Sequence, residues 1–321
     1  MAVADTVFTY GPSNVTSLIA TTLSTYGKTL ADNIHKAIPL LAWLSIKKRV
    51  TEEGGATIVR SVVYGSNTTA AFYASDDVLD TTIQDNFTAA QWQWRQAAAS
   101  IVVTGRIELQ NAGRAQVIDY AKAQIDNALA SLKETIDLRM FTPTSQVGSN
   151  ITPLPAIVAS SGTAGDINGT TNAWWASTAT TSGSFAARGL SDLRTAWDNV
   201  SVRMPAGGPD LILSDQTGYE AYEATLTPTV RYSDVSMGDL GFSNLKYKDA
   251  VWTWDPNCNS GYIYLLNSKA LELVQHQNRI FTMSEWVKPA NQDLKVAQVF
   301  WAGELTTNNR RKLAVLTSVS A

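Results

Sequence analysis

The chain has 321 residues, of which 45% are hydrophobic and 17% are charged, so it can form a compact core or two lobes. Its formal charge is only -3, from 25 basic and 28 acidic residues, and no block of lysines or arginines marks a nucleic-acid site by charge alone. This composition excludes a disordered tail, and it limits any DNA contact to a weak, nonspecific one.

The beginning of the chain is predicted to be an arm followed by short helices. Residues 1–16 are mostly small and polar, which is typical of a segment that orders only against a neighbour. In residues 17–50, apolar side chains approximate helical spacing, interrupted by Gly27 and Pro39, so two short helices are expected. Because neither a signal peptide nor a membrane-spanning stretch is visible, we expect a protein that stays in the cytoplasm where it is made, without a membrane partner.

A long β-arm is predicted between residues 46 and 106. Residues 57–64 are β-branched and aromatic, and residues 91–105 contain Trp92 and Trp94 before a second β-branched run, so each segment is predicted to be a long strand. The sequence between them, SNTTAAFYASDDVLDTTIQDNF, is too polar to pack a core of its own and too long for a simple hairpin loop. An arm that projects from the body explains this pattern.

The clearest helix follows residues 111–113, because apolar side chains recur there at steps of three or four as far as Met140. Such a helix spans roughly 35 to 40 Å at 1.5 Å per residue. Residues 142–184 are rich in Gly, Ser, Thr and Asn and are predicted to be a long loop, which Trp174 and Trp175 anchor by burial.

The last part of the chain is predicted to be a mixed α/β lobe. Ser191 is expected to cap a helix that runs to Val200, PDLILSD is expected to be a buried strand, and a second helix is expected to stop before Pro228. Turn residues then separate further predicted strands at 250–254, 261–267, 270–276, 296–302 and 313–319.

The sequence carries none of the common catalytic or nucleotide-binding motifs, such as G-x-S-x-G, G-x-x-x-x-G-K-S/T or G-x-G-x-x-G. His35 and His276 have no second ligand at metal spacing, and Cys258 lies in a predicted turn with no His or Lys nearby in sequence to activate it. The cluster Asp76, Asp77 and Asp80 lacks the spacing of a calcium loop and reads as a solvated face. We therefore expect no enzyme activity, no metal and no cofactor.

The order of these elements resembles that of the major capsid proteins of tailed bacteriophages with the HK97 fold. The residues that carry the resemblance are NGTTNAWW, GGPDLILSDQTGYEAYEATLTPTVRYSD, GFSNLKYKDAVWTWD, GYIYLLNSKALELVQH and VKPANQDLKVAQVFWAGELTTNNRRKLAVL, in this order. Together they cover nearly half of the chain, and no single one of them is diagnostic.

The resemblance implies an α+β fold with an extended E-loop at residues 51–95. A peripheral domain with a long spine helix would follow at 96–151, an axial domain at 152–243, and closing strands of both domains at 244–321. It further implies pentamers and hexamers in an icosahedral head that encloses double-stranded DNA and is assembled in the cytoplasm of a bacterial host. Scaffolding, portal and decoration proteins are the additional partners expected.

The resemblance also suggests which residues meet other molecules. Burial of E-loop aromatic residues across an adjacent subunit would stabilise an arm with little core of its own. Arg310 and Arg311 would pair with acidic groups across a subunit joint, or else finish an exposed turn. Residues of the spine helix would face the packed DNA, or else be ordinary solvated side chains. The E-loop residues are Tyr64, Phe72, Tyr73 and Phe87, and the residues on or near the spine helix are Arg114, Lys122 and Lys133.

Two departures from relatives shape the expectations. Some relatives join subunits through an E-loop lysine, but no lysine lies between Lys48 and Lys122, so a noncovalent shell is expected. The arm begins almost directly after Met1, so any scaffolding is expected to come from a separate protein. The alternatives are an encapsulin-like compartment around a cargo enzyme, a secreted β-rich adhesin or tail fibre, which the long helix and the missing signal disfavour, and an enzyme.

Overall fold

The computed structural model describes residues 38–47, 49–110, 120–143, 145–202, 207–226 and 244–320. The predicted arm at 1–16, the helix expected before Pro39, and His35 and Arg114 lie outside these ranges. The chain divides into two compact units. The described residues of the smaller unit belong to Ala97–Leu132 and Phe281–Phe300, and those of the larger unit belong to Lys36–Gln96, Lys133–Ile280 and Trp301–Ala321.

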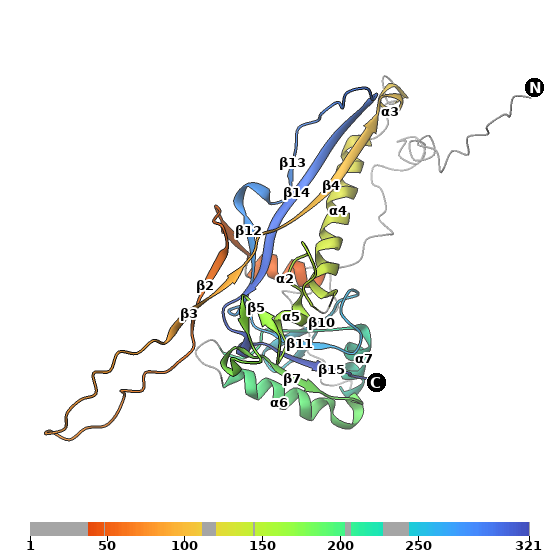
Figure 1. Cartoon of the computed structure of the whole chain (residues 1–321). Coiled ribbons are helices and arrows are strands. Elements are labelled where there is room, and N and C mark those ends of the chain that lie inside the picture. The colour runs from red at the N-terminus through yellow and green to blue at the C-terminus, as the bar shows by residue number, and fades with distance from the viewer. Residues whose placement is uncertain are drawn as a thin grey trace, which may run out of the picture. The chain divides into compact units, whose positions relative to one another are not determined.

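A six-stranded mixed sheet forms the centre of the larger unit, with the strand order β7-β15-β11-β8-β10-β9 (Figure 1). β7 pairs in parallel with β15, and β8 pairs in parallel with β10, while the other pairs are antiparallel. The helices α6 and α7 pack on this sheet. The bounds are β7 Thr178–Thr181, α6 Leu190–Ser201, β8 Leu211–Ser214, α7 Gln216–Thr225, β9 Asn244–Tyr247, β10 Ala250–Trp254, β11 Ile263–Leu266 and β15 Ala314–Thr317.

Local sequence explains most of these elements. All of β8 is buried, as the apolar run in PDLILSD predicts, and Asp215 caps α7 by accepting a hydrogen bond from the Gly218 N–H. The prediction that Ser191 caps α6 is wrong. A π-helical turn, η3 (Phe185–Gly189), leads directly into α6, so Ser191 lies inside the helix and donates to the Arg188 carbonyl instead.

A second set of strands in the larger unit consists of β1 (Arg49–Glu52), β12 (Leu271–His276) and the end of β14 (Leu294–Thr307). β1 is parallel to β12, and β12 is antiparallel to β14. The helix α2 (Pro39–Lys47) contacts β1 and β12. Pro39 was expected to interrupt a helix, but it begins one, because its fixed φ suits the first helical position.

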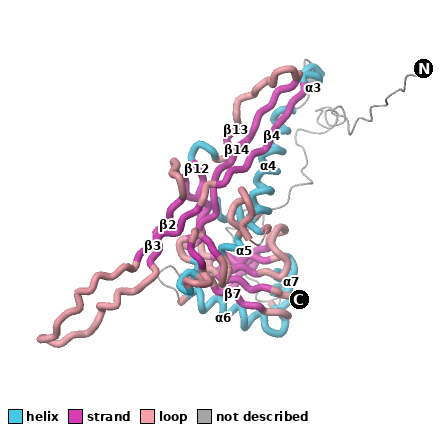
Figure 2. The backbone as a smooth tube through the Cα atoms, in the orientation of Figure 1, coloured by secondary structure: helices cyan, strands magenta, loops and turns pink. Residues whose placement is uncertain are grey.

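A two-stranded ribbon leaves this region and ends in a long loop. β2 (Ile58–Val63) pairs antiparallel with β3 (Phe87–Trp92), and residues 64–86 connect them without a strand (Figure 2). The sequence predicted one strand over residues 91–105. The structure breaks it between β3 and β4 (Arg95–Thr104), where the Trp94 indole Nε1 donates to the carbonyl of Gly55.

The smaller unit contains most of β4, α3 (Gly105–Gln110), β13 (Thr282–Met283) and the first part of β14, which pairs antiparallel with β13. Lys295 and Glu108 form an ion pair at 2.6 Å. The long helix α4 (Tyr120–Phe141) begins in the smaller unit and ends in the larger one. Its end confirms the prediction that the helix reaches about Met140.

The loop-rich segment predicted at 142–184 contains only short elements before β7. These are α5 (Leu154–Ile157), β5 (Thr163–Ala164), β6 (Ile167–Asn168) and η2 (Ala173–Trp175). Trp175 is only 1% exposed, and its indole Nε1 donates to the Ala164 carbonyl, so the predicted anchoring of the loop by burial is confirmed for this residue. None of the helices in the described ranges is long and apolar enough to cross a membrane.

Candidate assembly surface

One face of the β2–β3 ribbon packs against the chain's own loop segment. Val62 and Ala90 form a small buried cluster with Trp175, and Trp174 packs against it. The loop comes close at Gly165, which has a φ of +61° and accepts a hydrogen bond from the Gln91 N–H at 3.0 Å. A Cβ at Gly165 would lie 2.8 Å from the Ala90 Cβ, so only glycine allows this approach. The ribbon therefore has a fixed base.

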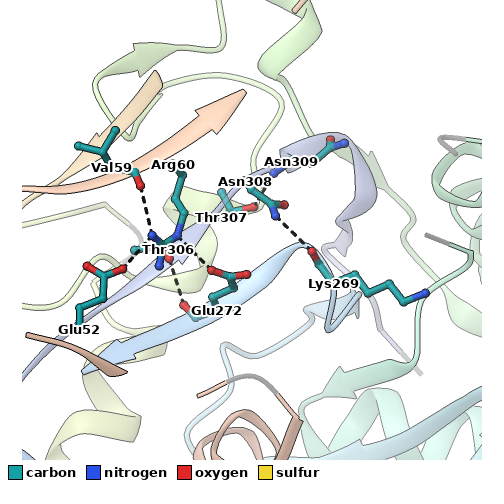
Figure 3. Close-up of polar contacts among 9 residues, drawn as sticks. All are labelled: Glu52, Val59, Arg60, Lys269, Glu272, Thr306, Thr307, Asn308 and Asn309. Carbon is teal, nitrogen blue, oxygen red and sulfur yellow. Dashed lines mark hydrogen bonds and ion pairs between the residues drawn. The ribbon is translucent and has the colours of Figure 1, made fainter. Parts of the chain in front are cut away.

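Arg60 supplies a second anchor for the same base (Figure 3). Its Nη1 lies 2.9 Å from Glu52 Oε1, and its Nε lies 3.0 Å from Glu272 Oε2. These three side chains come from β2, β1 and β12, and the Arg60 side chain is only 17% exposed. A partly desolvated arginine between two carboxylates holds the ribbon on the neighbouring strands. Arg60 is not among the residues predicted from the sequence, because its two partners come from other strands, β1 and β12.

The opposite face of the ribbon and the loop beyond it expose several large apolar side chains. On the ribbon these are Val59, Val63 and Phe87, and Phe87 is 71% exposed. In the loop, Phe72 and Ile83 are almost completely exposed. Exposed apolar surface of this extent marks an interaction site in a soluble protein. The remaining exposed apolar residues of the loop are Tyr73, Val78 and Leu79.

The hydrogen bonds within the loop are local. Asn67 accepts from the backbone N–H of Thr69, and Asp80 accepts from that of Thr82, while the Thr68 hydroxyl donates to Gln84 Oε1 across the loop. The hydrogen bonds from Thr82 lower the pKa of Asp80. Asp76, Asp77, Asp80 and Asp85 lie in this segment, and no basic residue occurs between Arg60 and Arg95. The loop therefore combines exposed apolar side chains with uncompensated negative charge.

The structure distinguishes among the predicted contact residues of the arm. Phe72, Tyr73 and Phe87 are exposed. A contact with a neighbouring subunit would require such exposure. Tyr64 differs, because its ring centroid lies 5.4 Å from that of Trp174 and its hydroxyl donates to the Asp85 carbonyl. Tyr64 is 38% exposed, so part of its ring remains available at the root of the loop.

Arg310 was expected at a subunit joint, and the structure corrects this expectation, because its side chain is fully buried inside the chain. Its guanidinium donates to five backbone carbonyls of α5 and of the loop that follows it, and burial lowers its pKa to about 10, so it stays protonated at neutral pH. Arg310 organises that loop from within. The carbonyl oxygens belong to Ile157 at 2.7 Å, Ala159 at 2.9 Å, Ala156 at 3.2 Å, Ser161 at 3.3 Å and Gly162 at 3.5 Å.

The other predicted contact residues with basic side chains that lie in the described ranges, Arg311, Lys122 and Lys133, remain at the surface in part or in full. Arg311 is half-buried, and its backbone N–H donates to Asn309 Oδ1. Lys122 and Lys133 are exposed on α4. Because eleven residues make about three helical turns, these two lysines lie on the same side of the helix.

The pKa values of two potentially reactive groups, Cys258 and Glu304, are raised by burial. Cys258 lies in the predicted turn, where burial and the carboxylates of Asp255 and Asp215 raise the pKa of its thiol well above the ordinary value. Burial raises the pKa of Glu304 to about 7, although the backbone N–H groups of Thr152 and Leu305 donate to it. Among the described residues, no three His, Cys, Asp or Glu side chains are arranged to hold a metal ion.

Comparison with solved structures identifies the fold. The chain is similar to the capsid asymmetric unit of Cyanophage A-1(L), with a TM-score of 0.67 and 15% identity over 91% of this chain and 96% of that one. It is also similar to the capsid of Myoviridae Phage XM1, with a TM-score of 0.56 and 12% identity over 90% and 94%. This is the HK97 capsid fold.

In terms of the HK97 fold, β2, residues 64–86 and β3 form the E-loop, and α4 is the spine helix. The fold is not confined to phage heads. The SrpI encapsulin of Synechococcus elongatus PCC 7942 matches with a TM-score of 0.62 and 13% identity over 97% of each chain. Neither the family models nor the curated proteins contain a match to the sequence. The likeness to these solved structures therefore establishes the fold, and the role of the chain has to be argued from its surface.

Proposed function

We propose that the chain is the shell-forming capsid subunit of a tailed phage, which assembles with copies of itself into pentamers and hexamers of a head around double-stranded DNA. The observation that carries the proposal is the E-loop, whose base is fixed by Trp175 and Arg60 while its apolar side chains point into solvent. A second copy of the chain is the partner expected to bury them, because capsid chains of the same fold form closed shells.

The contacts between subunits should be noncovalent. An isopeptide bond from the E-loop needs a primary amine, and this segment contains no lysine. Shells are therefore expected to release single chains in hot detergent, and a ladder of covalent oligomers on a gel would contradict this. Separate scaffolding, portal and decoration proteins complete the proposed set of partners.

Contact with DNA is proposed to be weak and electrostatic. Lys122 and Lys133 on one side of the spine helix are the described residues suited to meet phosphates, and Arg114 is the third residue proposed. Replacing the two lysines with glutamine should leave shell formation intact and reduce the salt dependence of DNA retention. Replacing Lys248, which pairs with Asp198, is the matched control.

The function is tested by electron microscopy of the protein expressed alone and together with its genomic neighbours. Closed icosahedral particles support the proposal, and only small species under every condition would contradict it. Deleting residues 66–86 should leave a soluble, folded chain that forms no shells, since the ribbon base does not depend on them. Intact particles from this deletion variant would refute the assigned role of the E-loop.

An encapsulin-like compartment is the second candidate, because the encapsulin match covers the whole chain as completely as the phage matches do. The two functions differ in what the particle contains. Particles purified from the native source should hold DNA and lack a co-purifying enzyme if the phage proposal is right. A protein cargo in place of DNA would favour the compartment.

A further inference from the structure

Two buried carboxylates meet where three elements of the larger unit join. Asp137, on the last turns of α4, is fully buried, and Asp255, directly after β10, is 1% exposed. Asn257 connects them, because its Nδ2 donates to Asp137 Oδ2 at 3.0 Å and its backbone N–H donates to Asp255 Oδ1 at 2.8 Å. The backbone N–H of Leu41, in the first turn of α2, also donates to Asp137.

The charges that surround this pair are acidic. Asp255 and Glu134 are the charged groups that act on Asp137, and both disfavour its ionised form. Asp215, which precedes α7, and the thiol of Cys258 lie close to the same turn. Within the described part of the chain, Asp137 Oδ1 is buried without a hydrogen-bond partner. Two adjacent negative charges in such a place would be strongly unfavourable.

We propose that Asp137 and Asp255 form a proton-dependent latch between α4, the first turn of α2 and the turn after β10, in which one retained proton at neutral pH prevents repulsion between two buried carboxylates. Loss of this proton in mildly alkaline solution loosens the junction. Burial and, secondarily, the charge of Asp255 raise the pKa of Asp137 to about 8, which agrees with a retained proton. The latch concerns the folding of the chain itself, so its test does not depend on the proposed shell function.

The direction of the pH effect follows from the raised pKa. The stabilising contribution of protonated Asp137 is complete below its ordinary pKa of 3.8 and is lost as the pH rises to about 8. An asparagine at position 137 keeps the shape and polarity of the protonated acid but does not titrate. Asp137→Asn should therefore remove this part of the pH dependence.

The experiment compares denaturant unfolding of the full chain and of Asp137→Asn between about pH 5 and 8. The ratio of their unfolding equilibrium constants should change by up to about tenfold per pH unit, in favour of the variant at higher pH. Asp126→Asn, at an exposed position on the same helix, is the control and should leave the profile unchanged. Parallel profiles for the wild type and Asp137→Asn would overturn the latch.

Infrared spectroscopy of the wild type provides a second test that holds even if the variant does not fold. The carbonyl stretch of a protonated carboxylic acid should be present at neutral pH, shift in heavy water and disappear in alkaline solution above the pKa of Asp137, about 8. Its absence at neutral pH would refute the retained proton. Where Asp137→Asn folds, the band should be weaker than in the wild type by the contribution of Asp137, while the contribution of Glu304, whose pKa is about 7, remains.

Discussion

The six-stranded sheet buries its large apolar side chains, whereas the E-loop exposes them to solvent. Trp252 of the sheet is fully buried, stacks on Tyr222 at 4.2 Å between ring centroids, and donates its indole Nε1 to Ser214 Oγ. Phe72 of the E-loop is fully exposed. A single chain thus contains one region that completes its own core and another whose apolar side chains have no core within the described structure.

This contrast separates folding from assembly. Substitutions in the sheet should change the free energy of unfolding of the subunit, whereas substitutions in the E-loop should change only the association of subunits. The predictions below run from the largest expected change in the unfolding free energy to the smallest.

Trp252→Ala should reduce the unfolding free energy by about 3 to 5 kcal/mol, because it removes a large buried ring and leaves a cavity. Trp254→Ala, on the same strand and only half-buried, is the control and should cost less. Denaturant unfolding followed by tryptophan fluorescence measures both changes. Equal losses of unfolding free energy would mean that the burial of Trp252 contributes no more to the stability of the sheet than the half-buried Trp254 does.

Arg310→Leu should cost on the order of 3 kcal/mol, because several buried carbonyls lose their donor at once. The loop after α5 should also become accessible to protease, since Arg310 binds it through the carbonyls of Ala159, Ser161 and Gly162. Arg311→Leu, at the adjacent half-buried position, should be milder. Resistance of the Arg310→Leu loop to protease would show that the carbonyl contacts are dispensable.

Glu304→Gln should alter the pH dependence of stability. The contribution of the protonated acid is complete below its ordinary pKa of 4.5 and is lost as the pH rises to about 7, so the wild type should lose stability over this range relative to the variant. The ratio of unfolding constants should change by up to about tenfold per pH unit. A constant ratio between pH 5 and 7 would contradict the buried state of this carboxyl.

Phe72→Ala should change the unfolding free energy by less than about 0.5 kcal/mol, because the side chain has no core contacts to lose. Its effect should appear in the yield of shells, measured by sedimentation. Val202→Ala, which removes an exposed apolar side chain outside the E-loop, should leave that yield unchanged. Similar yields for both variants would break the distinction between the two regions.

Local patterns in the sequence were sufficient for most of the elements. The strand predicted over residues 250–254 from the turn residues around it matches β10 in both bounds, and the apolar periodicity of α4 gives the observed end of the helix. The polar composition of the segment between β2 and β3 likewise indicates an arm. These features depend on residues that are close together in the sequence, so they can be read from one sequence alone.

The candidate site depended on contacts that a sequence pattern does not contain. Arg310 follows a turn signal, and nothing near it in sequence shows that the carbonyls of residues 156–162 surround its guanidinium. Asn257 and Asp137 are 120 residues apart in the chain, so the buried acid pair that they bridge is visible only once the fold brings α4 to the end of β10. Arg60 was missed for the same reason, since its partners come from β1 and β12.

The local hydrogen bonding of the E-loop has a consequence for how this protein evolves. Many hydrogen bonds of residues 67–84 are made within this segment. A mutation there should therefore change the unfolding free energy of the subunit only slightly. Under the proposed function, selection on this segment acts through the subunit that covers it. The amino acids of the loop and of the surface that it contacts are therefore expected to change together between related proteins. Those of the sheet should change independently of them, constrained by packing within the subunit.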